Sequence, residues 1–386
     1  MKLRSCVFLI CLVGVLGACQ DDEEEIKPAE KVSRTVLAYM VDDTNLSSYL
    51  KTNFNDMVKG MQFVDDSDCN MLVYSKLSEN APCLIKLSKL NGKVVADTLL
   101  IYEDQNPLNK SVMTDVLSTA FTRFPADSYG LVFLSHAEGW VPASTSASRS
   151  IGVYRNTSMN IDEFQQVLSD VGKHLSFVLF DACFMQSIEV AYELRNNVDF
   201  LIGSPTEIPG PGAPYADVME CLFSKHEAAL EIADAYFASY ARKYTGAYPI
   251  TNDNWTGGVS VSVIKSDALE QLAQKTEQIF FKYGTTTFSS NIMCYDRRST
   301  KYYYDLNQVV YALTQGNSDY TNWKSAFMKA RPYWETTAKN YSGSGGLFSM
   351  EGAEGVSTYI PSGISTSRAN EYYRTYDWTI ATGWGL

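Results

Sequence analysis

A histidine and a cysteine occupy similar places in this chain of 386 residues, each just past an apolar segment. His136 directly follows the apolar run at 129–135, and Cys183 comes 47 positions later, shortly after the apolar run at 177–180. An imidazole beside a thiol favours the thiolate, which is the attacking form of cysteine, and can later donate a proton to a leaving amine. The two residues therefore predict nucleophilic catalysis by Cys183 with His136 as its partner.

The placement of the pair is what favours catalysis, because cysteine is among the most frequently buried residue types and a lone histidine is more often structural. In an open α/β sheet, side chains that meet a ligand project from loops at the carboxyl ends of the strands. One loop and one right-handed helical crossover account for the separation of His136 and Cys183, which places both strand ends at one edge of the sheet. Neighbouring strands lie about 4.8 Å apart, so the two side chains can meet across a cleft.

The residues next to the pair suggest further catalytic groups. Residues 185–196 have helical spacing, and the positive end of that helix dipole would lower the pKa of the Cys183 thiol further. The backbone N–H groups of Cys183 and Ala137 could donate hydrogen bonds to the oxyanion that develops when a carbonyl is attacked.

The segments that must position these residues are apolar strands that alternate with helices. The strands lack in–out alternation, which indicates a mostly parallel sheet with helices on both faces, an α/β fold. The predicted strands are at 35–41, 70–74, 129–135, 177–180 and 200–203, with a hairpin or edge strand at 83–90; the predicted helices are at 46–61, 110–124, 160–173 and 185–196. The later part is richer in helix, with helices at 226–244, 266–283, 304–315 and 320–338 and an alternating strand at 259–264. It either completes the core or forms an accessory domain.

The first residues predict export and lipid attachment. Lys2 and Arg4 precede an apolar run that is too short for a membrane span of about 20 residues and is typical of a signal peptide. The run ends in Leu-Gly-Ala-Cys, which resembles a bacterial lipobox, in which the thiol of Cys19 is acylated. The acidic residues at 21–25 predict a solvated tether, and they also resemble a surface-export signal of some Gram-negative anaerobes. We expect a lipid-anchored protein of the bacterial cell envelope, in the outer membrane or at the cell surface.

Four segments result from these patterns: a signal peptide at 1–18, an acidic tether at 19–33, a catalytic core at 34–225 and a helix-rich C-terminal part at 226–386. Without the signal peptide the chain has 30 basic and 44 acidic residues. This balance argues against nucleic acid and anionic membranes as partners, so the N-terminal lipid is the one membrane contact that we expect. The sequence does not define an oligomeric state, and we expect a monomer.

Five cysteines remain beyond Cys19: Cys69, Cys83, Cys183, Cys221 and Cys294. An odd number in an exported protein leaves at least one thiol unpaired within the chain. Cys69 and Cys83 flank a predicted strand pair and could form a disulfide.

Three segments of the chain resemble the clostripain family of cysteine peptidases. They read TVLAYMVDDTNL at 35–46, YGLVFLSHAEGW at 129–140 and FVLFDACFMQSIEVAYELR at 177–195. The resemblance covers residues 34–220 well and the remainder loosely. It implies a caspase-like fold and the hydrolysis of polypeptide substrates through a thioester acyl-enzyme, with Cys183 attacking and His136 transferring the proton. A histidine about 50 residues before the nucleophile is also typical of caspases.

Two positions depart from the family pattern. Ala137 stands where the family usually has a glycine after the catalytic histidine; alanine keeps the N–H but loses easy access to positive φ. Residues 204–212 read SPTEIPGPG, so Pro211 stands where relatives carry an aspartate that supplies negative charge to an Arg/Lys pocket. Asp181 and Glu207 remain as candidate substrate-binding carboxylates, and the resemblance implies cleavage after Arg or Lys. The alternative role of Asp181 is to cap the following helix.

The polar segment at 143–158 lies where family members are often cut during maturation. Arg149 and Arg155 are the candidate autolysis sites, and the alternative is an ordinary exposed loop with two solvated arginines. No spacing of His, Cys and carboxylates suggests a metal such as zinc, and no cofactor is expected. The acidic loop at 251–258 is the one segment that suggests Ca²⁺, on which some relatives depend.

A catalytically inactive surface lipoprotein that binds peptides or glycans is the competing interpretation. The chain has 25 Tyr and 13% aromatic residues, which would suit a binding surface. Such a protein would tolerate loss of the Cys183 thiol, whereas a cysteine peptidase would not.

Overall fold

The computed structural model describes residues 28–42, 44–77, 80–142, 150–247, 255–284, 291–361 and 368–385. The predicted signal peptide, the lipid site at Cys19, most of the acidic tether and Arg149 lie outside these residues.

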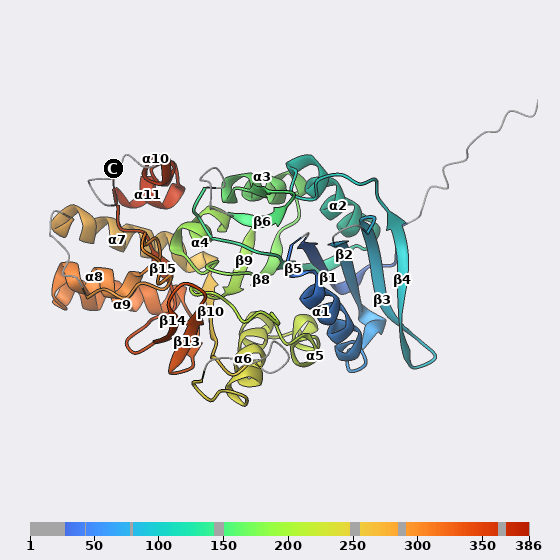
Figure 1. Cartoon of the computed structure of the whole chain (residues 1–386). Helices are drawn as coiled ribbons and strands as arrows, with labels where there is room; N and C mark the ends of the chain where they lie inside the picture. Colours follow the sequence, from blue (N-terminus) through green and yellow to red (C-terminus); the bar gives the residue numbers. More distant parts are fainter. Residues whose placement is uncertain are drawn as a thin grey trace, which may run out of the picture.

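One sheet of nine strands organises the described part of the chain (Figure 1). Its five central strands are parallel, and antiparallel strands extend it at both ends. In order across the sheet the strands are β12 (Tyr333–Thr336), β10 (Ser260–Lys265), β9 (Val198–Gly203), β8 (Leu175–Asp181), β5 (Ala126–Leu134), β1 (Val32–Asp42), β2 (Cys69–Leu77), β3 (Cys83–Leu90) and β4 (Lys93–Ile101). The mostly parallel α/β fold predicted from the sequence is confirmed.

Helices cover both faces of the sheet, which explains why the central strands are apolar throughout (Figure 1). Alternate residues of β1 face two separate cores: Leu37 and Tyr39 pack in one, and Val36 and Ala38 in the other. One core is covered by α2 (Lys110–Arg123), α3 (Ile161–Val171), α4 (Ile188–Leu194), α7 (Leu269–Tyr283), α8 (Leu306–Thr314), α9 (Ser318–Ala330), α10 (Arg368–Tyr373) and α11 (Asp377–Thr382). The other is covered by α1 (Ser47–Gly60), α5 (Tyr215–Val218) and α6 (Ala228–Ala241).

The C-terminal part joins the same sheet and the same cores. It supplies β10, which pairs with β9, and β12, which pairs with β10. The short strands β11 (Tyr304–Asp305) and β15 (Ser357–Thr358) pair with each other, and Ser357 donates its N–H to the carbonyl of Gln186, close to Cys183. The later half of the chain is therefore packed onto the segment that carries Cys183.

One predicted helix has the wrong extent, and one strand was missed. The helix expected at 320–338 ends at Ala330, because Pro332 cannot continue a helix, and 333–336 form β12 instead. The edge strand β4 was not predicted, since its residues are largely exposed and give no continuous apolar run. Cys69 and Cys83, which the sequence allowed to form a disulfide, are both free thiols. Cys83 pairs with Ser75, six residues along β2 from Cys69 and so roughly 20 Å away at about 3.3 Å per residue.

Within the described part of the chain, no helix combines the length and the apolar character that crossing a membrane requires.

Candidate active site

His136 and Cys183 lie at the carboxyl ends of adjacent parallel strands, as the sequence predicts. Leu134, the last residue of β5, is the register partner of Asp181, the last residue of β8. His136 and Cys183 each follow two residues later, and both line one cavity of about 310 Å³. The structure thus brings the two predicted catalytic residues to one site.

The imidazole of His136 is oriented by Asn45, which follows β1. Its Nε2 lies 2.9 Å from Oδ1 of Asn45. An amide oxygen only accepts hydrogen bonds, so Nε2 is the donor in this contact. The contact therefore favours the tautomer with hydrogen on Nε2, which makes Nδ1 the basic nitrogen. The backbone carbonyl of His136 accepts a hydrogen bond from Gly152, which holds the loop in place.

Cys183 sits in a tight turn between β8 and α4. The next residue, Phe184, has φ of 59°, a left-handed conformation that a bulky side chain adopts only when its surroundings hold it. Those surroundings are the carbonyl of Thr206, which accepts the Phe184 N–H, and the ring of Tyr303, which stacks on Phe184 at 4.7 Å. The Ile208 N–H lies 3.4 Å from the Cys183 sulfur and donates to it.

The expected helix dipole does not act on Cys183. The predicted helix at 185–196 begins only at Ile188, where Ser187 caps it, so the thiol is five residues before the helix. Burial raises the pKa of the Cys183 thiol to about 12, and the charge of Glu207 adds to the effect against the opposing Ile208 hydrogen bond. The surroundings of Cys183 in the free protein therefore favour the neutral thiol over the thiolate.

Within the described part of this loop, the backbone N–H of Ala137 is not used by the bridge that Ala137 forms. Ala137 forms an isolated antiparallel bridge with Ile151, and the two hydrogen bonds of that bridge are donated by Glu138 and Gly152. Ala137 is not in the left-handed region, so the departure from glycine requires no backbone strain. The positive φ of this loop falls instead at Gly139, at 56°.

The two candidate substrate-binding carboxylates line the same cavity. Asp181 is 5% exposed, and its oxygens accept hydrogen bonds from the Ala213 N–H at 2.9 Å and from the Tyr215 hydroxyl at 2.7 Å. Burial raises the pKa of Asp181 to about 6, against the effect of both hydrogen bonds. These contacts with residues after β9 replace the suggested role as a helix cap, since the cap of α4 is Ser187.

Glu207 is held by the hairpin of β13 (Lys339–Ser342) and β14 (Gly346–Ser349). Its two oxygens accept hydrogen bonds from the Ser342 hydroxyl at 2.8 Å and from the Gly343 N–H at 2.9 Å. Pro211 does not line the cavity; its carbonyl accepts a hydrogen bond from Asn53. Among the described residues that line the cavity, Asp181 and Glu207 are accompanied by no lysine or arginine.

Several lining residues were missed by the sequence analysis because nothing local marks them. They come from α1, from the segment before β10 and from β13, and they are mostly apolar or aromatic: Leu46, Tyr49, Leu50, Trp255 and Tyr341. Each contributes only through the tertiary fold, so no spacing in the sequence connects it with Cys183.

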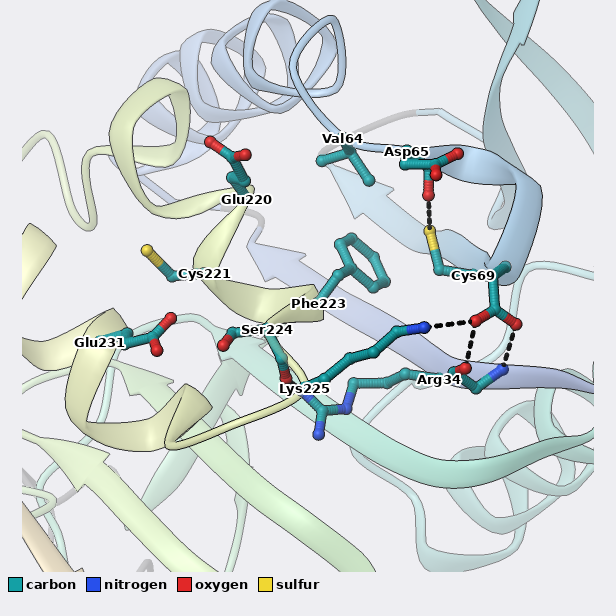
Figure 2. A pocket seen from close by; sticks show the side chains of 12 residues that line it. Arg34, Val64, Asp65, Cys69, Glu220, Cys221, Phe223, Ser224, Lys225 and Glu231 are labelled. Atoms are coloured by element: carbon teal, nitrogen blue, oxygen red, sulfur yellow. Dashed lines mark hydrogen bonds and ion pairs between the residues drawn. The ribbon is translucent and has the colours of Figure 1, made fainter.

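A second cavity, of about 440 Å³, lies at the opposite edge of the sheet, where β1 and β2 begin (Figure 2). It has two thiols, Cys69 and Cys221, which lie on different sides of it (Figure 2). Burial raises the pKa of Cys69 to about 12 and that of Cys221 to about 11. Among the described residues that line this cavity there is no histidine, so neither thiol has an imidazole as its partner there.

Of the two candidate autolysis sites, only Arg155 is described. It occupies the tight turn between β6 (Ile151–Tyr154) and β7 (Thr157–Met159) with φ of 46°, and its guanidinium pairs with Asp104 at 2.9 Å. In the described ranges no group of three His, Cys, Asp or Glu side chains is arranged to hold a metal ion. Half of the acidic loop at 251–258, residues 251–254, lies outside those ranges.

Comparison with known proteins gives the site a class. The model of the clostripain family matches residues 38–385. A secreted C11 cysteine protease of Bacteroides thetaiotaomicron, solved with an irreversible peptide inhibitor, is 43% identical with a TM-score of 0.84, covering 91% of this chain and 98% of its own. An inactive zymogen C11 protease of Parabacteroides distasonis is 27% identical with a TM-score of 0.78, and the match covers 92% of this chain and 99% of that protease. A B. fragilis cysteine protease is 45% identical with a TM-score of 0.58, and the match covers 61% of this chain and 97% of that protease. Among curated proteins, nothing matches the chain.

A mostly parallel α/β sheet with a thiol and an imidazole at adjacent strand ends defines a caspase-like cysteine peptidase. With the family match over most of its length, the chain belongs to the clostripain family, and it is a cysteine peptidase.

Proposed function

We propose that this protein is an endopeptidase in which Cys183 is the nucleophile and His136 the general base and acid. The observation that carries the proposal is that both side chains line one cavity, each two residues past the same register pair of β5 and β8. The inactive binding lipoprotein has no comparable observation in its favour.

Because the raised pKa of Cys183 favours a neutral thiol in the resting site, the base acts during the attack. As the Cys183 sulfur bonds to the scissile carbonyl carbon, its proton passes to Nδ1 of His136. The N–H groups of Ala137 and Cys183 stabilise the oxyanion. His136 then gives the proton to the leaving amine as the C–N bond breaks, which leaves a thioester on Cys183. Water, deprotonated by His136, hydrolyses the thioester and restores the thiol.

The acidic cavity supports cleavage after Arg or Lys. Asp181 and Glu207 supply negative charge beside Cys183, and a cationic side chain in the cavity would offset the cost of burying Asp181 as a charged group. The cavity thus retains a negative charge although Pro211 replaces the aspartate of relatives.

Lipid attachment at Cys19 and a place in the cell envelope remain part of the proposal. They are supported by the lipobox-like sequence, and one relative is described as a secreted protease. Maturation by cleavage at 143–158 is supported by the relative that is described as an inactive zymogen. The tight turn and ion pair of Arg155 favour Arg149 as the cleaved residue, because a protease needs an extended segment.

The test is hydrolysis of fluorogenic peptides with Arg at the cleaved position, together with labelling by a peptidyl chloromethyl ketone. Cys183→Ala and His136→Ala should each lower kcat/KM by at least about a thousandfold, and Cys183→Ala should also abolish labelling. The matched control is Cys221→Ala, which removes a half-buried thiol from the second cavity and should leave both signals intact. Full hydrolysis by Cys183→Ala would refute the assignment. Repeating the assay with a chelator tests the suggested dependence on Ca²⁺.

A further inference from the structure

The order of strands divides the catalytic cavity into two sides. His136 must give its proton to the leaving amine, so the leaving part of the substrate lies on the His136 side of Cys183, toward β5 and β1. The acyl part, which stays on the sulfur, then lies on the opposite side, toward β9, β10 and β12. This division rests on the proposed roles of His136 and Cys183.

The acyl side of the cavity has an aromatic wall. Trp255, just before β10, and Tyr341, on β13 after β12, both line the cavity and are half-buried. Their rings contact each other edge to face, with centroids 5.6 Å apart. The indole N–H of Trp255 donates to the carbonyl of Gly258 at 2.8 Å, so Trp255 needs no polar partner from a ligand. What Trp255 offers to the cavity is an apolar ring.

Hydrogen bonds fix this wall relative to the nucleophile. Glu207 accepts from Ser342 and Gly343, the two residues that follow Tyr341. The residue after Glu207, Ile208, donates its N–H to the Cys183 sulfur. A short chain of contacts therefore connects Tyr341 with Cys183, and a substrate side chain that packs on the wall would be positioned for attack.

We propose that Trp255 and Tyr341 form an acyl-side subsite, which binds a large apolar side chain of the substrate next to the cleaved residue. Alternate side chains of an extended peptide point in opposite directions, so the subsite selects at one of the two positions before the cleaved residue and not at both. Asp181 and Glu207 bind the side chain of the cleaved residue, and Trp255 and Tyr341 bind its apolar neighbour. The full preference is thus a basic residue preceded, at one position, by an aromatic or large aliphatic one.

The experiment measures kcat/KM for peptides with Arg at the cleaved position and Gly, Leu, Phe or Asp at each of the two preceding positions. The wild-type enzyme should favour Leu or Phe over Gly by about tenfold at one position, as expected for partial burial of one apolar side chain. Trp255→Ala and Tyr341→Ala should each reduce this ratio of kcat/KM values to twofold or less. Trp255→Phe should restore most of it.

Two controls keep the outcomes distinct. Phe281→Ala removes an aromatic ring that is 93% exposed on α7, and the ratio should not change. Active-site titration with the chloromethyl ketone corrects each variant for its folded fraction. A wild-type ratio near one at both positions, or a tenfold ratio that survives both alanine substitutions, would overturn the subsite. Hydrolysis by Cys183→Ala would instead overturn the catalytic assignment, whatever the ratio.

Discussion

Gly139 and Phe184 bring the loops after β5 and β8 into close backbone contact: a Cβ atom added to Gly139 would lie 2.5 Å from the carbonyl oxygen of Phe184. Gly139 is three residues past His136, and Phe184 directly follows Cys183. Because β5 and β8 are in register, the loops leave the sheet at the same level and pack backbone against backbone. Only a residue without a side chain permits this approach, and its φ of 56° adds a second reason for glycine.

Gly139→Ala should therefore separate the loops. A real Cβ cannot be 2.5 Å from a backbone oxygen, so one loop must move, and we expect a loss of about 2–4 kcal/mol in the free energy of unfolding. The kcat/KM for a peptide should fall at least tenfold. Urea unfolding and steady-state kinetics measure the two effects.

The matched control is Gly172→Ala. Gly172 also has positive φ, at 65°, but nothing lies within 4 Å of an added Cβ. It should cost only about 1 kcal/mol for the backbone conformation and should not affect kcat/KM. Equal losses at the two glycines would show that the contact with Phe184 has no role.

The charges around Cys183 should shift the pKa of its thiol in opposite directions. Burial is the largest cause of the raised pKa, and Glu207 and Glu138 raise it further, whereas Arg298 lowers it. Glu207→Gln should therefore make alkylation by iodoacetamide faster at a given alkaline pH, and Arg298→Gln should make it slower. The measurement is the alkylation rate between pH 8 and 10, with the reaction of the other thiols subtracted by using Cys183→Ala. Shifts in the same direction for both variants would contradict the electrostatic explanation.

The sequence predicts the parallel core and the placement of His136 and Cys183 at one edge of the sheet because these depend on local patterns. Apolar runs such as 129–135 and 177–180 become buried central strands, and the residues just past them reach one edge of the sheet. Strand positions alone did not distinguish inert residues from catalytic ones. The resemblance to the clostripain family is what indicated a catalytic role for His136 and Cys183.

What the sequence could not predict depends on tertiary contacts or on exposure. The strand β4 is too exposed to give an apolar run, and Trp255 and Tyr341 reach the cavity only through the packing of the C-terminal part. The raised pKa of Cys183 is set by burial and by Glu207, neither of which can be read from neighbours in the chain. The sequence pattern suggested a helix directly after Cys183, whereas the turn at Phe184 delays it to Ile188.

Asp181→Asn should lower kcat/KM selectively for substrates with a basic residue at the cleaved position. If Asp181 supplies the charge that binds Arg or Lys, kcat/KM for Arg peptides should fall about tenfold or more, and that for uncharged peptides much less. Asp217→Asn, at an exposed ion pair with Arg242, is the control and should change neither. With a pKa of about 6 for Asp181, the preference of the wild-type enzyme for Arg should also weaken as the pH falls from 7 to 5. An unchanged Arg preference in Asp181→Asn would assign the selectivity to Glu207.

Asp181 should also make the stability of the protein depend on pH, with a sign opposite to that of most carboxylates. Its pKa is about 6 in the folded chain, because burial disfavours the charged form. In the unfolded chain the pKa takes the ordinary value of an aspartate, 3.8. The folded state therefore binds the proton more tightly than the unfolded state. The resulting contribution to the free energy of unfolding is complete below about pH 4 and is lost as the pH rises through 6. Its slope is at most about 1.4 kcal/mol per pH unit, the value for one proton.

Urea unfolding of Cys183→Ala, which cannot digest itself, should be compared with that of Cys183→Ala/Asp181→Asn between pH 4 and 7.5. The free-energy difference between the two should change with pH over this range, with the second variant gaining relative stability as the pH rises. Asp305, whose pKa burial also raises to about 6, remains in both proteins and cancels from the comparison. A constant difference across the range would mean that Asp181 does not titrate there, and that its charge is available to substrates at every pH tested.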